Sequence, residues 1–147
     1  MSLQQWANNG WLKVLPTSKR EIGDLLGIVH RDLADASQKG ISTDARFGLA
    51  YNAALKLCTI LLRAEGYLPA NDSAHYRTLQ TLSLILGDQH KANVDYLEGC
   101  RTKRKTLVYS YVGGTTDGDV KELCDFVKEL ETIVIGQLKA SHPNLVP

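Results

Sequence analysis

The segment from Phe47 to Leu62 restricts most strongly what this chain can fold into. As a helix, it is apolar on almost every side. Its polar or small exceptions fall on one narrow stripe: Gly48, Asn52, Lys56 and Thr59, with Arg63 extending it. A helix that is apolar nearly all round must be enclosed by other elements. We therefore predict a central helix that begins near Ser42 to Asp44 and ends at about Glu65.

Shorter amphipathic segments flank this central helix. A first helix is predicted over Ser2 to Asn9, and Gly10 ends it. Three apolar side chains can clamp this helix onto the bundle: Trp6, Trp11 and Leu12. Ser18 followed by Glu21 is a capping-box pattern, and it opens a second helix with one apolar stripe that Gly40 closes.

Three more helices are expected after the central one. Ser73 can cap a short helix that carries Tyr76, Leu79, Leu82, Ser83 and Leu86. A long helix runs from about Gln89 to Tyr111, and a last one starts at Thr116 or Asp117. The tail from His142 and Pro143 onward is expected to fray.

No segment alternates in the way that strands do between turns, so the fold class predicted is all-α. Short connections favour antiparallel neighbours, hence an up-and-down four-helix-type bundle with an extra short N-terminal helix. The chain has 147 residues, which fits a single domain. Within it, residues 1–16 are expected to form the N-terminal helix and clamp, and residues 18–141 the bundle core.

Composition excludes several classes of function. Seventeen basic and sixteen acidic residues give a net charge of +1, so a surface for nucleic acid has to be a local patch. No apolar run reaches the ~18 residues of a membrane span, and no signal pattern opens the chain. Cys58, Cys100 and Cys124 are predicted to be reduced core residues of a cytoplasmic protein. The histidines show no metal-ligand spacing, so neither metal nor cofactor is expected.

The helix predicted from Gln89 carries the strongest local conflict with this pattern. Its buried stripe should consist of Val94, Leu97, Arg101, Arg104, Val108 and Tyr111, because these positions share one face. Two arginines in an apolar stripe need a carboxylate partner or a cleft. In a structural role they pair with Asp44, Asp95 or an acid of the last helix, or their heads reach past the apolar stems into solvent. In a functional role they form a small basic cleft for phosphate with Lys105, with Tyr109 and Tyr111 beside it for stacking.

The polar triplet His75-Tyr76-Arg77 is a weaker candidate. It follows a loop at the start of a predicted helix. It either lies at the rim of a cleft or is simply the capped, solvated beginning of that helix.

Two stretches resemble the HEPN family, the helical domains found beside minimal nucleotidyltransferases in prokaryotic toxin–antitoxin and defence loci. Asp44-Ala45-Arg46-Phe47-Gly48-Leu49-Ala50-Tyr51-Asn52-Ala53-Ala54 resembles their central helix. Arg101-Thr102-Lys103-Arg104-Lys105-Thr106-Leu107-Val108-Tyr109-Ser110-Tyr111 resembles their signature, an Arg, often followed by Asn, then a His four to six residues after the Arg and often a Tyr two residues beyond. The resemblance extends over roughly Ser42 to Leu138.

This resemblance implies metal-independent cleavage of RNA in a cleft shared by two protomers. The family's Arg binds the scissile phosphate and its His transfers a proton to or from the ribose 2′-hydroxyl. Arg104 takes the place of that Arg and Tyr111 that of the terminal Tyr, whereas Lys105 replaces the Asn and Tyr109 replaces the His. A phenol titrates near pH 10, so Tyr109 is a poor general base at neutral pH.

The resemblance therefore implies a homodimeric RNA-binding protein with weak or lost endoribonuclease activity. Its catalytic candidates are Arg104 and Tyr109, and its nucleic-acid-binding candidates are Arg101, Arg104, Lys105 and Tyr111. The alternative is a non-catalytic partner of a minimal nucleotidyltransferase, whose target hydroxyl belongs to Tyr109 or Tyr111. A bundle with an unrelated small-molecule or scaffold role is a third hypothesis. No membrane partner is expected.

Overall fold

A computed structural model describes residues 1–71, 74–109 and 112–147, apart from the side chain of Tyr109. The predicted cap Ser73 and the predicted site residue Tyr111 lie outside these ranges. The described part of the chain is mostly helical and holds one small sheet. In chain order its elements are α1 (Leu3–Asn8), β1 (Leu12–Val14), α2 (Lys19–Ala36), α3 (Thr43–Ala64), β2 (Tyr67–Pro69), α4 (Ala74–Leu86), a 3₁₀ turn η1 (Asp88–His90), α5 (Lys91–Tyr109), α6 (Asp117–Ser141) and a 3₁₀ turn η2 (Pro143–Leu145).

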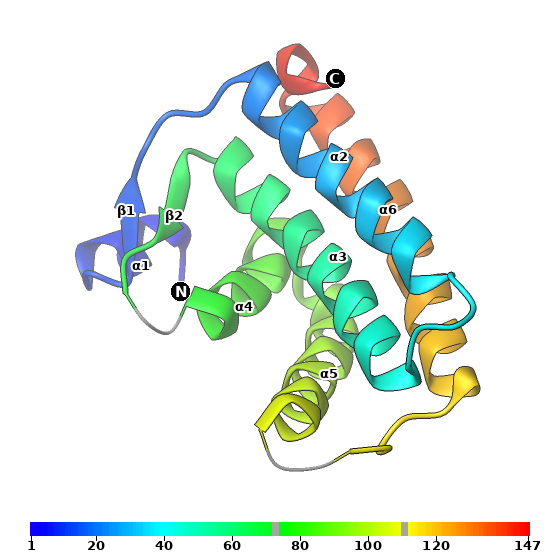
Figure 1. Ribbon diagram of the computed structural model, residues 1–147. Helices are drawn as coiled ribbons and strands as arrows, with labels where there is room; N and C mark the ends of the chain where they lie inside the picture. The colour runs from blue at the N-terminus through cyan, green and yellow to red at the C-terminus, as the bar shows by residue number, and fades with distance from the viewer. Residues whose placement is uncertain (72–73, 110–111) are drawn as a thin grey trace.

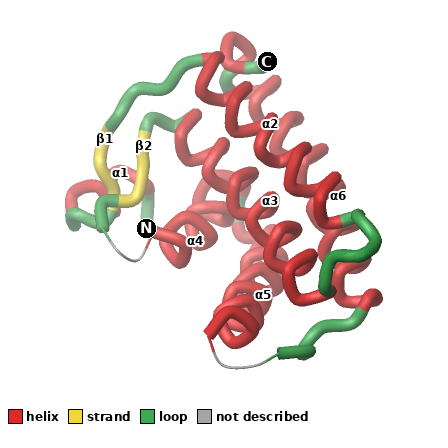
Figure 2. Tube along the Cα trace, viewed as in Figure 1, coloured by secondary structure: helices red, strands yellow, loops and turns green. Residues whose placement is uncertain are grey.

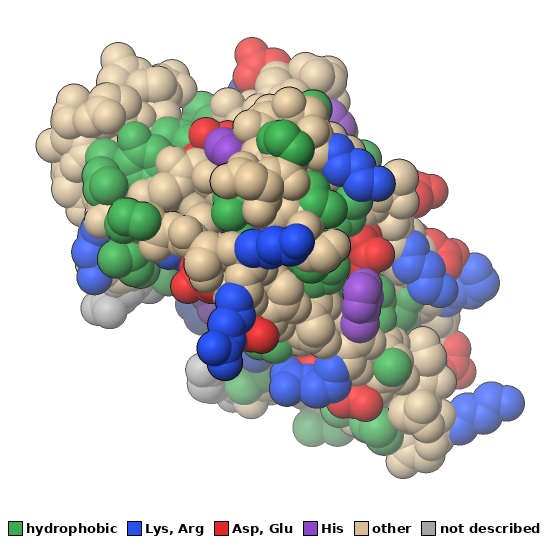
Figure 3. Space-filling model, turned by 90° about the horizontal axis from the view of Figure 1, so that it is seen from above, with side chains coloured by type: hydrophobic (Ala, Val, Ile, Leu, Met, Phe, Trp, Pro, Cys, Tyr) green, Lys and Arg blue, Asp and Glu red, His purple; other side chains and the backbone are tan. Residues whose placement is uncertain are grey.

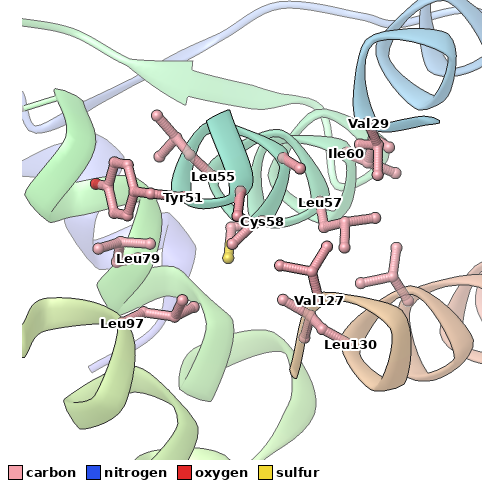
Figure 4. Close-up of a cluster of buried hydrophobic side chains, with 14 of the residues drawn as sticks. Val29, Tyr51, Leu55, Leu57, Cys58, Ile60, Leu79, Leu97, Val127 and Leu130 are labelled. Atoms are coloured by element: carbon pink, nitrogen blue, oxygen red, sulfur yellow. The ribbon is translucent and has the colours of Figure 1, made fainter. Parts of the chain in front are cut away.

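Helix α3 lies at the centre of the molecule, as its apolar sequence predicts. Helices α2 and α6 pack along one side of it, and α4 and α5 pack on the other (Figure 1). Side chains of α3 accordingly extend in several directions, with Tyr51 toward the α4 side and Leu57 toward α6 (Figure 4). The prediction of a helical fold around a buried central helix is confirmed.

Local capping sets where three of the long helices begin. The hydroxyls of Ser18, Ser42 and Thr116 each accept a hydrogen bond from a backbone N–H in the first turn of α2, α3 and α6. These bonds satisfy donors that have no partner inside the helix. The predicted starts of these three helices are therefore confirmed.

The expectation that the chain contains no strand is wrong. β1 and β2 pair antiparallel, with Leu12 opposite Pro69 and Val14 opposite Tyr67, and they lie beside α1 (Figure 2). Each strand has only three residues, which is too short to show an alternating pattern. We call α1, β1 and β2 together the N-terminal module.

The predicted aromatic clamp lies inside this N-terminal module. Trp6 and Leu12 are buried against Leu62 of α3. The indole rings of Trp6 and Trp11 meet edge to face, with 5.6 Å between their centroids. The clamp therefore fixes the module to the C-terminal half of the central helix.

Arg63 is buried, although the sequence places it on the polar stripe of α3. Its Nε donates to Glu21 Oε1 at 2.8 Å, and its two terminal nitrogens donate to the backbone carbonyls of Leu15, Pro16 and Tyr67 at 2.8 to 3.1 Å. The guanidinium thus connects the chain before α2 with β2. Its five donors in a planar fork suit several carbonyls at once.

The C-terminal tail does not fray, contrary to the prediction. His142 Nε2 lies 3.1 Å from Glu65 Oε1, and η2 follows directly. Leu145 and Val146 then pack against the core. Two apolar residues close to the end are enough to hold the tail down, since burial stabilises by roughly 25 cal/mol per Å² of apolar surface.

All three cysteines are free and buried, as predicted. Burial raises the pKa of Cys58 to about 12 and that of Cys100 to about 11. α3 is the one helix among the described residues that is long and apolar enough to cross a membrane, but most of it is enclosed by the other helices. That is the position of a core helix. A cytoplasmic location stays a prediction.

Candidate functional site

The second half of α5 leaves the core, so the predicted buried stripe is only partly correct. Val94, Leu97 and Cys100 are buried, but the side chain of Val108 is 57% exposed. Leu107 still packs partly on the core, whereas the end of α5 lies beside the beginning of α3, at the edge of the bundle (Figure 1). Val108 is exposed because no described element covers that edge. Tyr111, the last predicted member of the stripe, lies outside the described residues.

Arg101 and Arg104 both lie at the surface of the second half of α5. Neither pairs with Asp44, with Asp95 or with an acid of α6, the partners proposed from the sequence. Arg101 binds Glu98, one turn earlier on its own helix, with Nη2 and Oε2 3.1 Å apart. Asp44 instead accepts hydrogen bonds from the Gly113 N–H and the Thr115 hydroxyl, each at 2.6 Å. Among the described residues, Arg104 has neither an ion pair nor a hydrogen bond.

The side chain of Arg104 lies against Tyr51 and Gly48 of α3. Its guanidinium carbon lies 5.7 Å from the centre of the Tyr51 ring. A Cβ placed on Gly48, one turn earlier, would come 3.8 Å from Arg104 Nε, an ordinary van der Waals contact, so Arg104 lies directly over this glycine. α3 thus presents a small residue and a ring face to an arginine with no carboxylate partner. A ring face attracts a cation without neutralising it.

His75, in the first turn of α4, joins this arrangement. The centroids of its ring and the Tyr51 ring are 6.3 Å apart. Partial burial of the ring lowers the pKa of His75, and the charges of Arg104, Lys56 and Arg101 lower it further. At pH 7 the imidazole is therefore neutral and can accept a proton or a hydrogen bond.

Lys56 of α3 is another neighbour of His75. The two residues line a pocket of about 230 Å³ between α3, α4 and β2. Lys56 also has no ion pair among the described residues. We call Lys56, His75, Arg101 and Arg104 the cationic site. Its one carboxylate partner among the described residues is Glu98, so positive charge is in excess.

The hydroxyl of Tyr51 is buried and has no hydrogen-bond partner in the described part of the chain. Burial raises its pKa, so it stays protonated, while Arg101 and Arg104 act in the opposite direction. A buried polar group without a partner is rare and calls for an explanation. Here it is a hydrogen-bond donor close to two guanidinium groups.

A groove of about 460 Å³ lies on the outer side of Arg104, between α2, α3 and α5. Gly48, Leu107 and Val108 contribute its small and apolar lining. Its carboxylates are already occupied, because Asp32 accepts from Asn52 and pairs with Arg31, and Asp44 is bound as described above. Arg104 therefore both lines this groove and belongs to the cationic site.

The structure brings together some of the predicted site residues and not others. Arg101 and Arg104 lie close to one another, whereas Lys105 is exposed and has no described contact with them. Tyr109 and Tyr111 fall outside the described side chains. His75, predicted only as a rim residue, lies within the site, and Lys56 was not expected there. Its place on the narrow polar stripe of an otherwise apolar helix is the signal that points to it.

The opposite end of the molecule shows no such concentration of positive charge. Seen from above, cationic and anionic side chains lie interspersed on that face (Figure 3).

Comparisons with models of protein families, with curated proteins and with solved structures each give no match for this chain.

Proposed function

We propose that the protein is a HEPN-like, RNA-binding protein that holds RNA phosphates at the cationic site, with weak or lost metal-independent endoribonuclease activity. The observation that supports it best is Arg104. This arginine is partly buried against Tyr51 and lacks any carboxylate partner among the described residues. Like charges held together cost free energy that a bound polyanion offsets.

The chemistry of the neighbouring groups favours phosphate over a simpler anion. A guanidinium presents two parallel N–H groups that match two phosphate oxygens. The Tyr51 hydroxyl needs an acceptor, which a phosphate oxygen supplies once the side chains over it separate. The like-charged neighbours Arg101 and Lys56 extend the site along α5 and α3, as a chain of phosphates requires.

Binding of a labelled RNA pool at two salt concentrations tests the proposal. With about three cations at the site and a slope near −0.7 for each, log affinity should fall with log salt at a slope of about −2. The RNA should remain largely intact on a denaturing gel with chelator present. Absence of binding at low salt would contradict the RNA-binding part, and robust cleavage lost in Arg104→Ala would show that catalysis is retained.

Any residual cleavage needs a group that accepts the 2′-hydroxyl proton. Among the described side chains of the cationic site, His75 is the one that can act as a general base, because burial and the neighbouring cations lower its pKa and leave the imidazole free to take up a proton. It lies on a different helix from the position where the family carries its His. We expect whatever cleavage remains to depend on His75.

The affinity for RNA should increase as the pH falls from 7.5 to about 5.5. Tyr51 and Lys56 from α3 and Arg101 and Arg104 from α5 face His75, and burial with these charges keeps it neutral in the free protein. A bound phosphate favours the imidazolium, so binding takes up a proton. We expect a three- to tenfold gain, measured by anisotropy, from one added charge.

His75→Gln should remove most of this gain, whereas His30→Gln on α2 should keep it. In the free protein, acidification has the opposite effect: it lowers the stability of the fold. Because the folded protein disfavours the charged ring, His75 contributes stability above pH 6.5 that is lost as the pH falls. An affinity that is independent of pH in the wild type would contradict a place for His75 beside the phosphate.

We also propose that each chain keeps the up-and-down four-helix-type bundle expected from its sequence and that two copies pair, as the HEPN resemblance implies, with their α5 helices together. Val108 is exposed next to Arg104 in the groove, and Leu107 is only partly covered. A second copy of α5 would cover this apolar edge. Light scattering at micromolar concentration should give twice the chain mass of 16.2 kDa. A mass near that of one chain, at any concentration up to 100 µM, would contradict pairing.

The partnership with a minimal nucleotidyltransferase remains a prediction from the sequence. Its target hydroxyls, Tyr109 and Tyr111, lie outside the described side chains. The cationic site favours RNA, because a protein partner would not require an arginine without a described carboxylate partner, Arg104, beside a buried phenol.

A further inference from the structure

Tyr76 is a large aromatic side chain on the surface between the cationic site and the N-terminal module. It is 41% exposed, although the sequence groups it with Leu79 and Leu82, which are buried. Tyr76 belongs to the first turns of α4, directly after His75. Figure 1 shows α4 between the two strands and α5. Its ring lies beside the cationic site, since it is close to Arg101.

Two guanidinium groups lie near this ring. The guanidinium carbon of Arg101 lies 5.9 Å from the Tyr76 centroid, and that of Arg77 lies 5.5 Å from it. Arg77 in turn lies 3.9 Å from the centroid of Trp11. Aromatic rings and guanidinium groups thus lie near one another from α5 to Trp11, the residue before β1. We call Arg101, Tyr76, Arg77 and Trp11 the aromatic row.

Arg77 is held in the aromatic row by rings. Its Nε is buried and has no hydrogen-bond partner in the described ranges, and its guanidinium also lies 5.3 Å from the centroid of Trp6. It has no ion pair with a described residue. An arginine between indole rings is stabilised by cation–π attraction. The contact fixes the N-terminal module against α4, so the row is preorganised.

We propose that the aromatic row is a base-stacking subsite for single-stranded RNA, with Tyr76 as the ring on which a base stacks. This inference rests on the proposed function and specifies its substrate. Every base offers a π-face, so stacking on aromatic rings and guanidinium planes recognises unpaired strands with little preference for sequence. A duplex keeps its bases inside and cannot use such a row. The strand then runs from the phosphate at Arg104 toward the N-terminal module.

Three probes of equal length separate the contributions of base and phosphate. The first is a single-stranded RNA oligonucleotide, the second is the same strand in a duplex, and the third is an abasic ribose-phosphate oligomer. The wild type should bind the single strand about tenfold more tightly than the abasic oligomer, since one stacked base contributes roughly that much. The duplex should bind no better than the abasic oligomer.

Two variants at one position test the ring itself. Tyr76→Ala should lose the tenfold preference for the single strand and keep the affinity for the abasic oligomer. Tyr76→Phe keeps the ring and should keep the preference. Thermal unfolding of both variants establishes that they are folded, which is expected because Tyr76 is largely exposed.

Tryptophan fluorescence gives a second readout at the far end of the aromatic row. The two tryptophans of the chain, Trp6 and Trp11, both belong to the clamp of the N-terminal module. Saturating single-stranded RNA should change their emission, and the abasic oligomer should change it much less. Tyr76→Ala should reduce the change.

The outcomes distinguish this inference from the proposed function. Equal affinity of the wild type for the RNA and the abasic oligomer would overturn base stacking while phosphate binding stands. An unaltered preference for the single strand in folded Tyr76→Ala would also overturn it. Binding of neither probe at low salt would overturn the proposed function, and this inference with it.

Discussion

Arg104→Ala should weaken RNA binding at least tenfold while changing the free energy of unfolding by less than ~1 kcal/mol. A charge-assisted bond to phosphate contributes roughly 1.5–3 kcal/mol, which sets the size of the loss. The small effect on stability follows because Arg104 has no ion pair or hydrogen bond with a described residue, and because its removal relieves repulsion with Arg101. The slope of log affinity against log salt should also become shallower by about 0.7.

Arg20→Ala is the matched control. Arg20 is exposed near the start of α2, at the end of the molecule away from the C-terminal end of α5. Its replacement by Ala changes the net charge by the same amount as Arg104→Ala. It should leave RNA affinity within about twofold. If Arg104→Ala instead melts far below the wild type, Arg104 is a structural residue of the bundle. If both variants lose affinity equally, the binding is a diffuse charge effect.

Arg63→Ala should lower the free energy of unfolding by about 3–5 kcal/mol, a large part of the stability of a domain of this size. The change removes the Arg63 donors of three backbone carbonyls, whereas Glu21 keeps the hydrogen bond from the Thr17 hydroxyl. An acceptor that is fully buried costs roughly 1–3 kcal/mol when it loses its donor, and these partly buried carbonyls cost less each, so the sum over the three carbonyls and the emptied space around Arg63 sets the expected loss. Chemical unfolding in urea, with the slope m compared between variants, measures the loss.

Glu21→Gln and Arg63→Lys show which bonds matter. The Glu21 side chain is 42% exposed, so its replacement should cost less than ~1 kcal/mol. Arg63→Lys keeps the charge but lacks the planar fork, so it should fall between the other two variants. A loss from Glu21→Gln as large as that from Arg63→Ala would show that the ion pair, and not the set of carbonyls, holds this segment.

The starts of the long helices could be predicted because their causes are local. A hydroxyl three residues before the N–H that it caps is visible in the sequence, as Ser18 and Thr116 illustrate. The strands β1 and β2 could not be predicted in this way. Their pairing joins Leu12 to Pro69, far apart in sequence, and each strand is too short for a pattern.

For the same reason, only part of the candidate site could be predicted from the sequence. Arg101 and Arg104 stand out because they interrupt an apolar stripe on one helix. His75 lies on another helix, and only the packing of α4 between α3 and α5 brings it next to Arg104. The buried stripe was extended wrongly to Val108, since periodicity shows which residues share a face and not where the neighbouring helix ends.

The central position of α3 has a consequence for synthesis on the ribosome. This helix is apolar on nearly every side, yet α6, which covers one of its flanks, begins only at Asp117. At about 5–20 residues per second, several seconds pass between the emergence of the two helices. Through that interval the nascent chain exposes apolar surface along α3, so it meets the requirements of a chaperone client until its last helix leaves the exit tunnel.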